Sequence, residues 1–294
     1  MPISLPSCLL KKTEIRCGGK LIDLASPVVM GIMNVTPDSF YAESRSFTEA
    51  VMEQRAEQIL SEGARIIDIG AYSSRPGADH IDEEEEYQRL KSGIAVVRKY
   101  SNDIPISVDT FRAGIIRRLV GKYGELIAND ISGGELDSNM FSTVAELKLP
   151  YILMHMQGTP QTMQSNPTYS DVIGQVIGYF TEKISRLNEL GVVDIVLDPG
   201  FGFGKTLDHN YELLSRMEDL QVFGLPLLVG VSRKSMLYKL LNIEPQKALN
   251  ATTVVNTISL MKGANILRVH DVWAAVEAVT IYTKLCEQQD ERSC

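Results

Sequence analysis

Polar and charged side chains in this sequence stand directly after short apolar runs, where they could bind a small ligand. One set carries oxygen atoms that accept hydrogen bonds from a donor-rich ring, and its members are Asn34, Asp68, Asp109, Asn129, Asp130 and Asp198. A second, cationic set could hold an anion, and it consists of Arg75, Lys205, Arg233, Lys234 and Arg268, which His270 could join. The mixture predicts a ligand with a heterocyclic end and an anionic end.

The segment 198–206, Asp-Pro-Gly-Phe-Gly-Phe-Gly-Lys-Thr, superficially resembles the phosphate-binding loop of nucleotide-binding proteins. That loop requires a glycine where this chain has Pro199, so we exclude a nucleotide-binding protein of that class. The segment is instead a glycine-rich turn that places Phe201 and Phe203 beside Asp198. We expect both rings to stack on a flat ligand rather than to pack in the core.

Cations near the end of the chain indicate an anion site. Arg233 and Lys234 precede an expected helix, where the helix dipole disfavours positive charge, so we expect them to face a ligand. Arg268 and His270 alternate along one strand and leave the same face, although they could instead form a structural pair. The carboxamide oxygen of Asn34 could help to hold Mg²⁺ on a diphosphate.

The elements that must position these side chains alternate regularly along the chain. Most of the expected strands are continuously apolar, as in strands covered on both faces, and they lie at 28–34, 65–71, 105–110, 126–132, 151–156, 194–200, 226–232 and 266–272. Expected helices lie between and after them, at 47–61, 83–100, 112–123, 139–148, 170–190, 209–220, 246–263 and 272–289. This alternation favours a closed (β/α)8 TIM barrel over an open doubly wound sheet. In a barrel the carboxyl ends of the strands converge at one rim, which brings the polar side chains together.

We expect a single domain over residues 1–294, with a short N-terminal β-hairpin at about 14–24 and the barrel at about 28–289. The net charge of −8 argues against nucleic-acid binding, and no apolar run is long enough to span a membrane. The N-terminus does not resemble a signal peptide. The four cysteines lack metal-ligand spacing, so we expect reduced thiols in a cytoplasmic protein.

Taken together, the motifs resemble those of the dihydropteroate synthase family of pterin-binding enzymes. They occur in the family's order over roughly residues 28–279, and as a set they are highly specific. The matching segments are 34–40, 68–70 with 74–77, 107–110, 129–134, 153–158, 198–205, 232–235 and 268–271. Two positions depart from the family pattern: residues 41–46 replace a Ser-Asp-Gly-Gly type of turn, and Tyr72 stands where a glutamate is common.

The resemblance implies condensation of 6-hydroxymethyl-7,8-dihydropterin diphosphate with p-aminobenzoate, which yields 7,8-dihydropteroate and diphosphate. It implies that the pterin is held by Asp109, Asn129, Met154, Asp198, Gly230 and Lys234, and the diphosphate by Asn34, Arg268 and His270 with Mg²⁺ on Asn34. The aminobenzoate side would be lined by Ser73, Ser74, Arg75, Pro76, Phe203 and Ser235. Catalysis would depend on Asp109, Lys234, Arg268 and His270. Sulfonamides would compete with p-aminobenzoate, and the protein would be a homodimer.

Two other functions are compatible with the same barrel. A pterin-binding methyltransferase would share the pterin-binding carboxylates and asparagine, but it has no need for cations around a diphosphate. A catalytically silent paralogue would bind pterin without turnover, and the altered loop after Phe40 leaves this alternative open.

Overall fold

A parallel barrel forms the centre of this computed structural model, which describes residues 12–35, 45–72, 81–159, 162–163 and 167–290. Its strands are hydrogen-bonded in the order β8-β7-β6-β5-β4-β3-β10-β9. A parallel bridge between Leu197 and Leu227 joins β8 to the segment before β9 and closes the ring. The strands are β3 (Val28–Asn34), β4 (Ile66–Gly70), β5 (Ile106–Asp109), β6 (Ile127–Asp130), β7 (Tyr151–Met154), β8 (Ile195–Asp198), β9 (Leu228–Val229) and β10 (Ile266–Val269). The predicted TIM barrel is therefore confirmed, and the open sheet is excluded.

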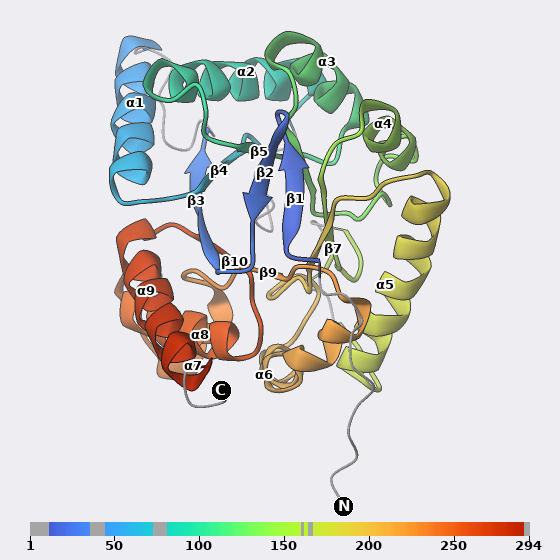
Figure 1. The fold of residues 1–294 in the computed structure, drawn as a ribbon, viewed down its shortest axis with the longest axis vertical. Coiled ribbons are helices and arrows are strands. Elements are labelled where there is room, and N and C mark those ends of the chain that lie inside the picture. Colours follow the sequence, from blue (N-terminus) through green and yellow to red (C-terminus); the bar gives the residue numbers. More distant parts are fainter. Residues whose placement is uncertain (1–11, 36–44, 73–80, 160–161, 164–166, 291–294) are drawn as a thin grey trace, which may run out of the picture.

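Helices surround the barrel on its outer side (Figure 1). They are α1 (Arg45–Ser61), α2 (Glu83–Tyr100), α3 (Ala113–Tyr123), α4 (Met140–Leu147), α5 (Val172–Glu189), α6 (Leu207–Ser215), α7 (Ser235–Leu241), α8 (Leu249–Met261) and α9 (Val272–Asp290). The Asp82 side chain caps α2 by accepting from the Glu85 N–H at 2.7 Å. The predicted helix at 246–263 corresponds to α8, and the separate helix α7 ends at Asn242 in a left-handed conformation. None of the described helices is long and apolar enough to cross a membrane.

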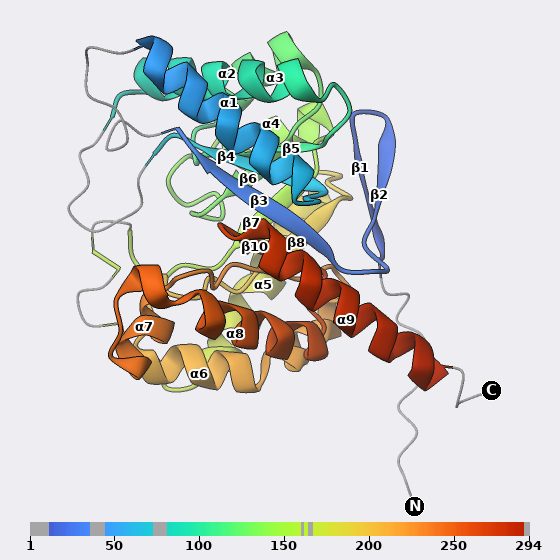
Figure 2. The ribbon, with the colours of Figure 1, turned by 90° about the vertical axis from the view of Figure 1, so that its left-hand side faces the viewer.

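The predicted N-terminal hairpin closes the foot of the barrel (Figure 2). It consists of β1 (Glu14–Cys17) and β2 (Lys20–Asp23), and its turn is formed by Gly18 and Gly19, both with positive φ. Apolar side chains of the hairpin pack against inward-facing residues from the first halves of the strands, and this cluster comprises Ile15, Cys17, Ile22, Leu24, Val28, Met30, Ile66, Ile127, Ile152, Val196, Leu228 and Ile266. The foot of the barrel interior is therefore filled by apolar side chains.

The interior changes from apolar to polar one layer higher. Successive inward-facing residues of a strand are two positions apart. Two residues beyond the apolar cluster, the strands therefore carry Asp68, Asn129, Met154, Asp198, Gly230 and Arg268. The polar rim expected from the strand ends is thus a layer of side chains inside the mouth of the barrel. It lies directly above the apolar cluster.

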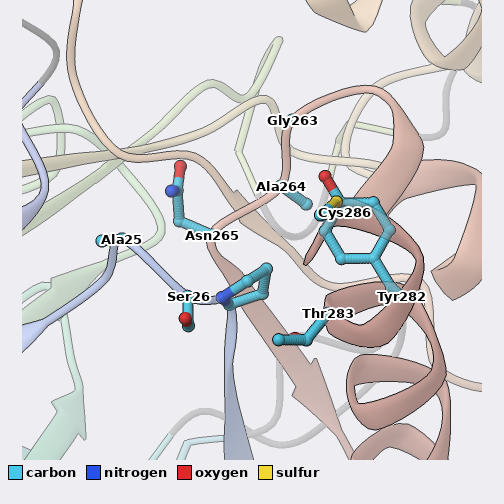
Figure 3. A pocket seen from close by; sticks show the side chains of 9 residues that line it. Ala25, Ser26, Gly263, Ala264, Asn265, Tyr282, Thr283 and Cys286 are labelled. Atoms are coloured by element: carbon cyan, nitrogen blue, oxygen red, sulfur yellow. The ribbon is translucent and has the colours of Figure 1, made fainter. Parts of the chain in front are cut away.

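A small cavity also lies at the foot of the barrel, between the turn after α8 and helix α9 (Figure 3). Its volume is about 130 Å³, and Pro27, Tyr282 and Cys286 are among the residues that line it. The Asn265 side chain beside it is already engaged, because it donates to the Leu24 carbonyl and accepts from the Leu227 N–H. The polar and charged residues predicted to bind a ligand lie instead at the opposite end of the barrel, at the carboxyl ends of the strands.

Candidate active site

Arg268 joins two carboxylates across the mouth of the barrel. Its Nε lies 2.6 Å from Asp68 Oδ2, and its Nη2 lies 2.6 Å from Asp109 Oδ2. Asn129 Nδ2 donates to the other Asp68 oxygen at 3.2 Å, and the backbone register places Asn129 beside Asp109. The oxygen-bearing set and the cationic set are therefore interleaved rather than confined to separate halves of the rim.

Burial dominates the electrostatics of this network. It raises the pKa of Asp109 to about 7, although the neighbouring Arg268 acts to lower it. Burial also acts to lower the pKa of Arg268, but the charges of Asp68 and Asp109 raise it above its ordinary value. The guanidinium thus stays charged, while burial favours the protonated form of Asp109.

Asp198 and Lys234 lie beside this network, and the charge of each acts on the pKa of the other. Asp198 Oδ1 accepts from the Gly200 N–H at 2.8 Å, and burial raises the pKa of Asp198 while the Lys234 charge opposes that shift. Burial lowers the pKa of Lys234 to about 8, against the effect of Asp198. Lys234 Nζ donates to the Phe201 carbonyl and lies 4.5 Å from the centre of the Phe203 ring. The structure therefore brings together Asp198, Lys234 and Phe203, as the sequence predicts.

The glycine-rich turn contains two departures from the prediction. Phe201 is fully buried in the core, so the expectation that both rings stack on a ligand is wrong for Phe201. Lys205 was expected among the cations of the rim, but it is only 3% exposed. Its Nζ lies 2.9 Å from His155 Nδ1, 2.9 Å from the Gly200 carbonyl and 3.2 Å from the Phe203 carbonyl. Lys205 therefore stabilises the glycine-rich turn through buried hydrogen bonds rather than facing a ligand.

The protonation of this buried pair follows from its surroundings. Burial and the nearby Lys205 charge lower the pKa of His155 to about 2, so the imidazole is neutral. Its Nδ1 can then accept from Lys205 Nζ, which also contacts the carbonyls of His155, Gly200 and Phe203. Burial lowers the pKa of Lys205 itself to about 7.

Arg233 differs from Lys234, although the two are adjacent. Its φ of 54° is left-handed, and its guanidinium forms two hydrogen bonds of 2.8 Å with the two carboxylate oxygens of Asp271. A further Arg233 donor binds the Gln246 carbonyl at 2.8 Å. Arg233 therefore lies at the rim cavity, as predicted, but its charge is balanced within the protein by Asp271.

A cavity of about 390 Å³ opens at the rim beside β3 and β10, and it is lined by Ile32, Asn34, Arg55, Arg233, His270 and Asp271. It brings Asn34 and His270 together, as the resemblance implies. It also contains Arg55 of α1, which the sequence analysis missed, because a basic residue inside an ordinary helix gives no signal of its own.

His270 is held as a neutral donor at this cavity. Burial lowers its pKa to about 4, and the charges of Arg268, Arg55 and Arg233 contribute in the same direction. Ser232 Oγ accepts from the His270 backbone N–H at 3.2 Å and lies 3.1 Å from His270 Nδ1. In the tautomer in which Ser232 Oγ donates to Nδ1, the ring proton is on Nε2 and can be donated to an anion.

The remaining predicted residues fall into two groups. Met154 is buried in the inner layer. A methyl group added to Gly230 would lie 3.9 Å from both the Arg268 side chain and Lys234 Nζ. The glycine therefore keeps the space between these two cations open. Ser235 is the first residue of α7. Four predicted residues lie outside the described part of the chain, namely Ser73, Ser74, Arg75 and Pro76.

Tyr72, one of the two departures from the family pattern, packs against the turn after β5. Its ring meets the Phe111 ring edge-on at 5.3 Å, and the Arg112 guanidinium lies 5.8 Å from the Tyr72 ring centre. Arg112 in turn pairs with the buried Glu86 of α2. The residue that replaces the common glutamate thus has an aromatic and cationic environment of its own.

A metal ion would find few protein ligands here. Among the described residues, no group of three or more His, Cys, Asp or Glu side chains could hold one. Asn34 offers a single amide oxygen at the cavity. This suits Mg²⁺, which keeps several waters and binds mainly through substrate phosphates when it accompanies a nucleotide or a diphosphate.

A barrel with carboxylates, an amide and cations in its upper layer has the features of an enzyme active site. The family model for pterin binding enzymes matches residues 30–270, so the chain belongs to that family. It is 45% identical over 268 residues to the dihydropteroate synthase of Escherichia coli strain K12, which covers 90% of this chain and 93% of that protein. It is 40% identical over 254 residues to the dihydropteroate synthase of Synechocystis, covering 85% and 86% of the two chains.

Solved structures give the same result. The dihydropteroate synthase of Yersinia pestis with a sulfonamide drug has a TM-score of 0.86 and 40% identity, covering 93% of this chain and 99% of that chain. The Xanthomonas albilineans dihydropteroate synthase with 4-aminobenzoic acid has a TM-score of 0.85 and 34% identity, covering 93% and 98%. The resemblance drawn from the motifs is therefore confirmed, and among the expected functions the synthase is favoured over the methyltransferase.

Proposed function

We propose that this protein is an alkyl transferase of folate biosynthesis that condenses 6-hydroxymethyl-7,8-dihydropterin diphosphate with p-aminobenzoate. The products are 7,8-dihydropteroate and diphosphate. The observation that carries this proposal is the paired arrangement at the barrel mouth. There, Arg268 joins Asp68 and Asp109, and the charge of Lys234 acts on the buried Asp198 carboxylate nearby. Together with 45% identity to a dihydropteroate synthase over most of the chain, it supports the synthase reaction.

The pterin would occupy the inner layer of the mouth. Its amine and ring N–H groups suit the carboxylates of Asp198 and Asp109, and its carbonyl and ring nitrogen suit Lys234 and Asn129. Because Asp198 is buried and Lys234 is half-buried, hydrogen bonds to them are largely shielded from water. Met154 and Gly230 would provide a surface without competing polar groups.

The diphosphate would lie at the rim cavity. His270 Nε2–H and Arg268 would donate to its oxygens, and the Asn34 carboxamide would hold Mg²⁺ that accompanies the diphosphate. When bound, Mg²⁺ would supply positive charge to the leaving group. Arg268 would thereby lie between the pterin carboxylates and the diphosphate.

The reaction then needs no protein nucleophile. The bond between the pterin methylene carbon and the diphosphate oxygen breaks, and its electron pair leaves with the diphosphate. The cation left on the methylene carbon is delocalised into the pterin ring, and the aromatic amine attacks it and loses one proton. Arg268 and His270 stabilise the charge that develops on the departing oxygen.

The aminobenzoate would bind outside the pterin, against the Phe203 ring and Ser235. Phe203 is held in place by Lys234 at its ring and by Lys205 at its carbonyl. We propose that sulfonamides, which share the shape and charge of p-aminobenzoate, compete for this position. A Yersinia pestis synthase of the family has been solved with such a drug.

We further propose a cytoplasmic homodimer that pairs through its last helices. Both described cysteines, Cys17 and Cys286, are free thiols, as expected in a reducing compartment. Exposed apolar side chains gather on α7, α8 and α9, and they are Leu240, Leu241, Val254, Ile258, Met261, Trp273, Ile281 and Leu285. Apolar side chains concentrated on neighbouring helices are typical of a protein interface.

Diphosphate release from the two substrates and Mg²⁺ tests the proposed reaction. We expect turnover by the purified protein, and competition between a sulfonamide and p-aminobenzoate in the same assay. Pterin binding without any diphosphate release would instead identify a catalytically silent paralogue. Inhibition that does not respond to the aminobenzoate concentration would contradict the assigned aminobenzoate pocket.

A further inference from the structure

The charge balance of the rim cavity leaves one cation uncompensated. Arg233 is neutralised by Asp271, and His270 is uncharged at neutral pH. Arg268, just below, lies between two carboxylates. Within the described part of the chain, Arg55 forms no ion pair, and its partners are uncharged oxygen atoms. The positive charge that faces this cavity therefore comes chiefly from Arg55.

The Arg55 guanidinium spans the two segments that carry the predicted diphosphate ligands. Its Nε and Nη2 donate to the Ile32 carbonyl of β3 at 3.3 and 3.0 Å, and Nη2 also donates to the His270 carbonyl at 2.6 Å. Ile32 precedes Asn34 by two residues, so Arg55 holds the backbone of both Asn34 and His270 in place. Nη1 donates to Gln58 Oε1 at 3.0 Å.

Arg55 retains donor capacity for a ligand. A guanidinium has five N–H groups, and these contacts use four of them, which leaves one Nη1–H without a partner among the described residues. Burial lowers the pKa of Arg55, while Glu62 and Asp271 oppose that shift. Since an arginine stays protonated in proteins, a half-buried positive charge persists at the cavity wall, and an anion would stabilise it.

We propose that Arg55 is a phosphate-binding residue of this cavity, which contacts the diphosphate through Nη1 and positions Asn34 and His270 through its carbonyl contacts. The proposal rests on the proposed function, because it assigns the diphosphate of that reaction to this cavity. Arginine suits the role, since its planar fork matches phosphate oxygens and gives charge-assisted hydrogen bonds.

Titration calorimetry with inorganic diphosphate and Mg²⁺ tests the proposal on the full-length wild type, R55M, R55K and R117M. Loss of one charge-assisted contact should weaken diphosphate binding by roughly tenfold or more in R55M. R55K keeps the charge but not the fork, so its affinity should fall between the two. R117M is the matched control, because Arg117 pairs with Glu146 on the exposed surface, and it should bind diphosphate like the wild type.

Binding of unphosphorylated 6-hydroxymethylpterin separates a phosphate-binding role from a structural one. In R55M it should stay within about twofold of wild type, since Arg55 does not line the pterin position. R55M with wild-type diphosphate affinity, or with equal losses for both ligands, would overturn the proposal while leaving the proposed function intact. A wild type that binds neither ligand would overturn both. If R55M does not fold, R55K takes its place in the test. Wild-type diphosphate affinity in R55K would overturn the proposal that the planar guanidinium of Arg55 binds the diphosphate.

Discussion

Removing the charge of Arg268 should destabilise the protein by leaving two carboxylates without their shared cation. In R268M, Asp68 and Asp109 would face each other at the mouth of the barrel. Breaking a buried ion pair by removing one partner costs roughly 3–5 kcal/mol. Asp68 retains its bond from Asn129, and the Asp109 side chain is 21% exposed, so the low end of that range, about 3 kcal/mol, is expected.

The size of the loss should depend on pH. Arg268 lowers the pKa of Asp109, so its removal moves that pKa further above about 7. Above pH 7 the folded variant then binds more protons than the folded wild type, and the stability difference between them grows as the pH rises. At pH 6 Asp109 is largely protonated in both proteins, and the difference should be smaller than at pH 8.

Denaturant unfolding at pH 6 and pH 8 measures both effects. R268M should also melt roughly 5–10 °C below wild type at pH 8. The variant R268M/D109N should recover part of the loss, because one of the two stranded charges is removed. R117M, which breaks an exposed pair, should unfold close to wild type. A wild-type unfolding free energy for R268M at pH 8, or a loss that is equal at the two pH values, would refute this account of the network.

Four further outcomes are expected. The pKa of Asp109 is about 7 in the folded state against an ordinary 3.8, so between pH 4 and 7 the folded state binds one proton more than the unfolded state. This contribution to the free energy of unfolding should therefore be lost as the pH rises from 4 to 7. Denaturation of D109N should lack that contribution. K205M should leave His155 Nδ1 and the Phe203 carbonyl without their Lys205 donor and weaken pterin binding more than diphosphate binding in calorimetry, whereas equal losses would show a purely structural role. G200A should lower the melting temperature, because Gly200 has a φ of 70° and an added methyl would collide with the His155 carbonyl; an unchanged melting temperature would contradict the close approach. I258E should convert the proposed homodimer to a monomer in light scattering, and an unchanged mass would place the interface elsewhere.

The fold could be predicted from the sequence because its signal is repeated along the whole chain. Every barrel strand is buried on both faces, so it reads as a continuous apolar run, and the strand ends mark the rim. The inner layer also follows from the sequence, since Asp68, Asn129, Asp198 and Arg268 each stand near the end of such a run. The hairpin was predictable from Gly18 and Gly19, because glycine adopts the positive φ of a tight turn with little steric cost. Both glycines have positive φ in the structure.

The pairing of charges could not be predicted in the same way. A strand end shows which rim a residue reaches, but not which of several neighbours it contacts there. Arg233 and Lys234 are adjacent, yet one binds Asp271 and the other faces Asp198, because the left-handed backbone at Arg233 sends their side chains apart. Arg55 reaches the site through packing of α1 on β3, and helix periodicity carries no information about that contact.

Arg268 can serve the pterin and the diphosphate at once because its donors exceed its carboxylate partners. Its Nε and Nη2 are occupied by Asp68 and Asp109, while an arginine also offers donors on Nη1. A diphosphate can therefore bind without displacing either carboxylate. Its negative charge would act to raise the pKa of Asp109 further, so that arrival of the diphosphate favours the protonated form of the acid that faces the pterin. In the proposed function, the two ends of the substrate would thus be coupled through one guanidinium, which accounts for a cation that stands among the carboxylates rather than apart from them.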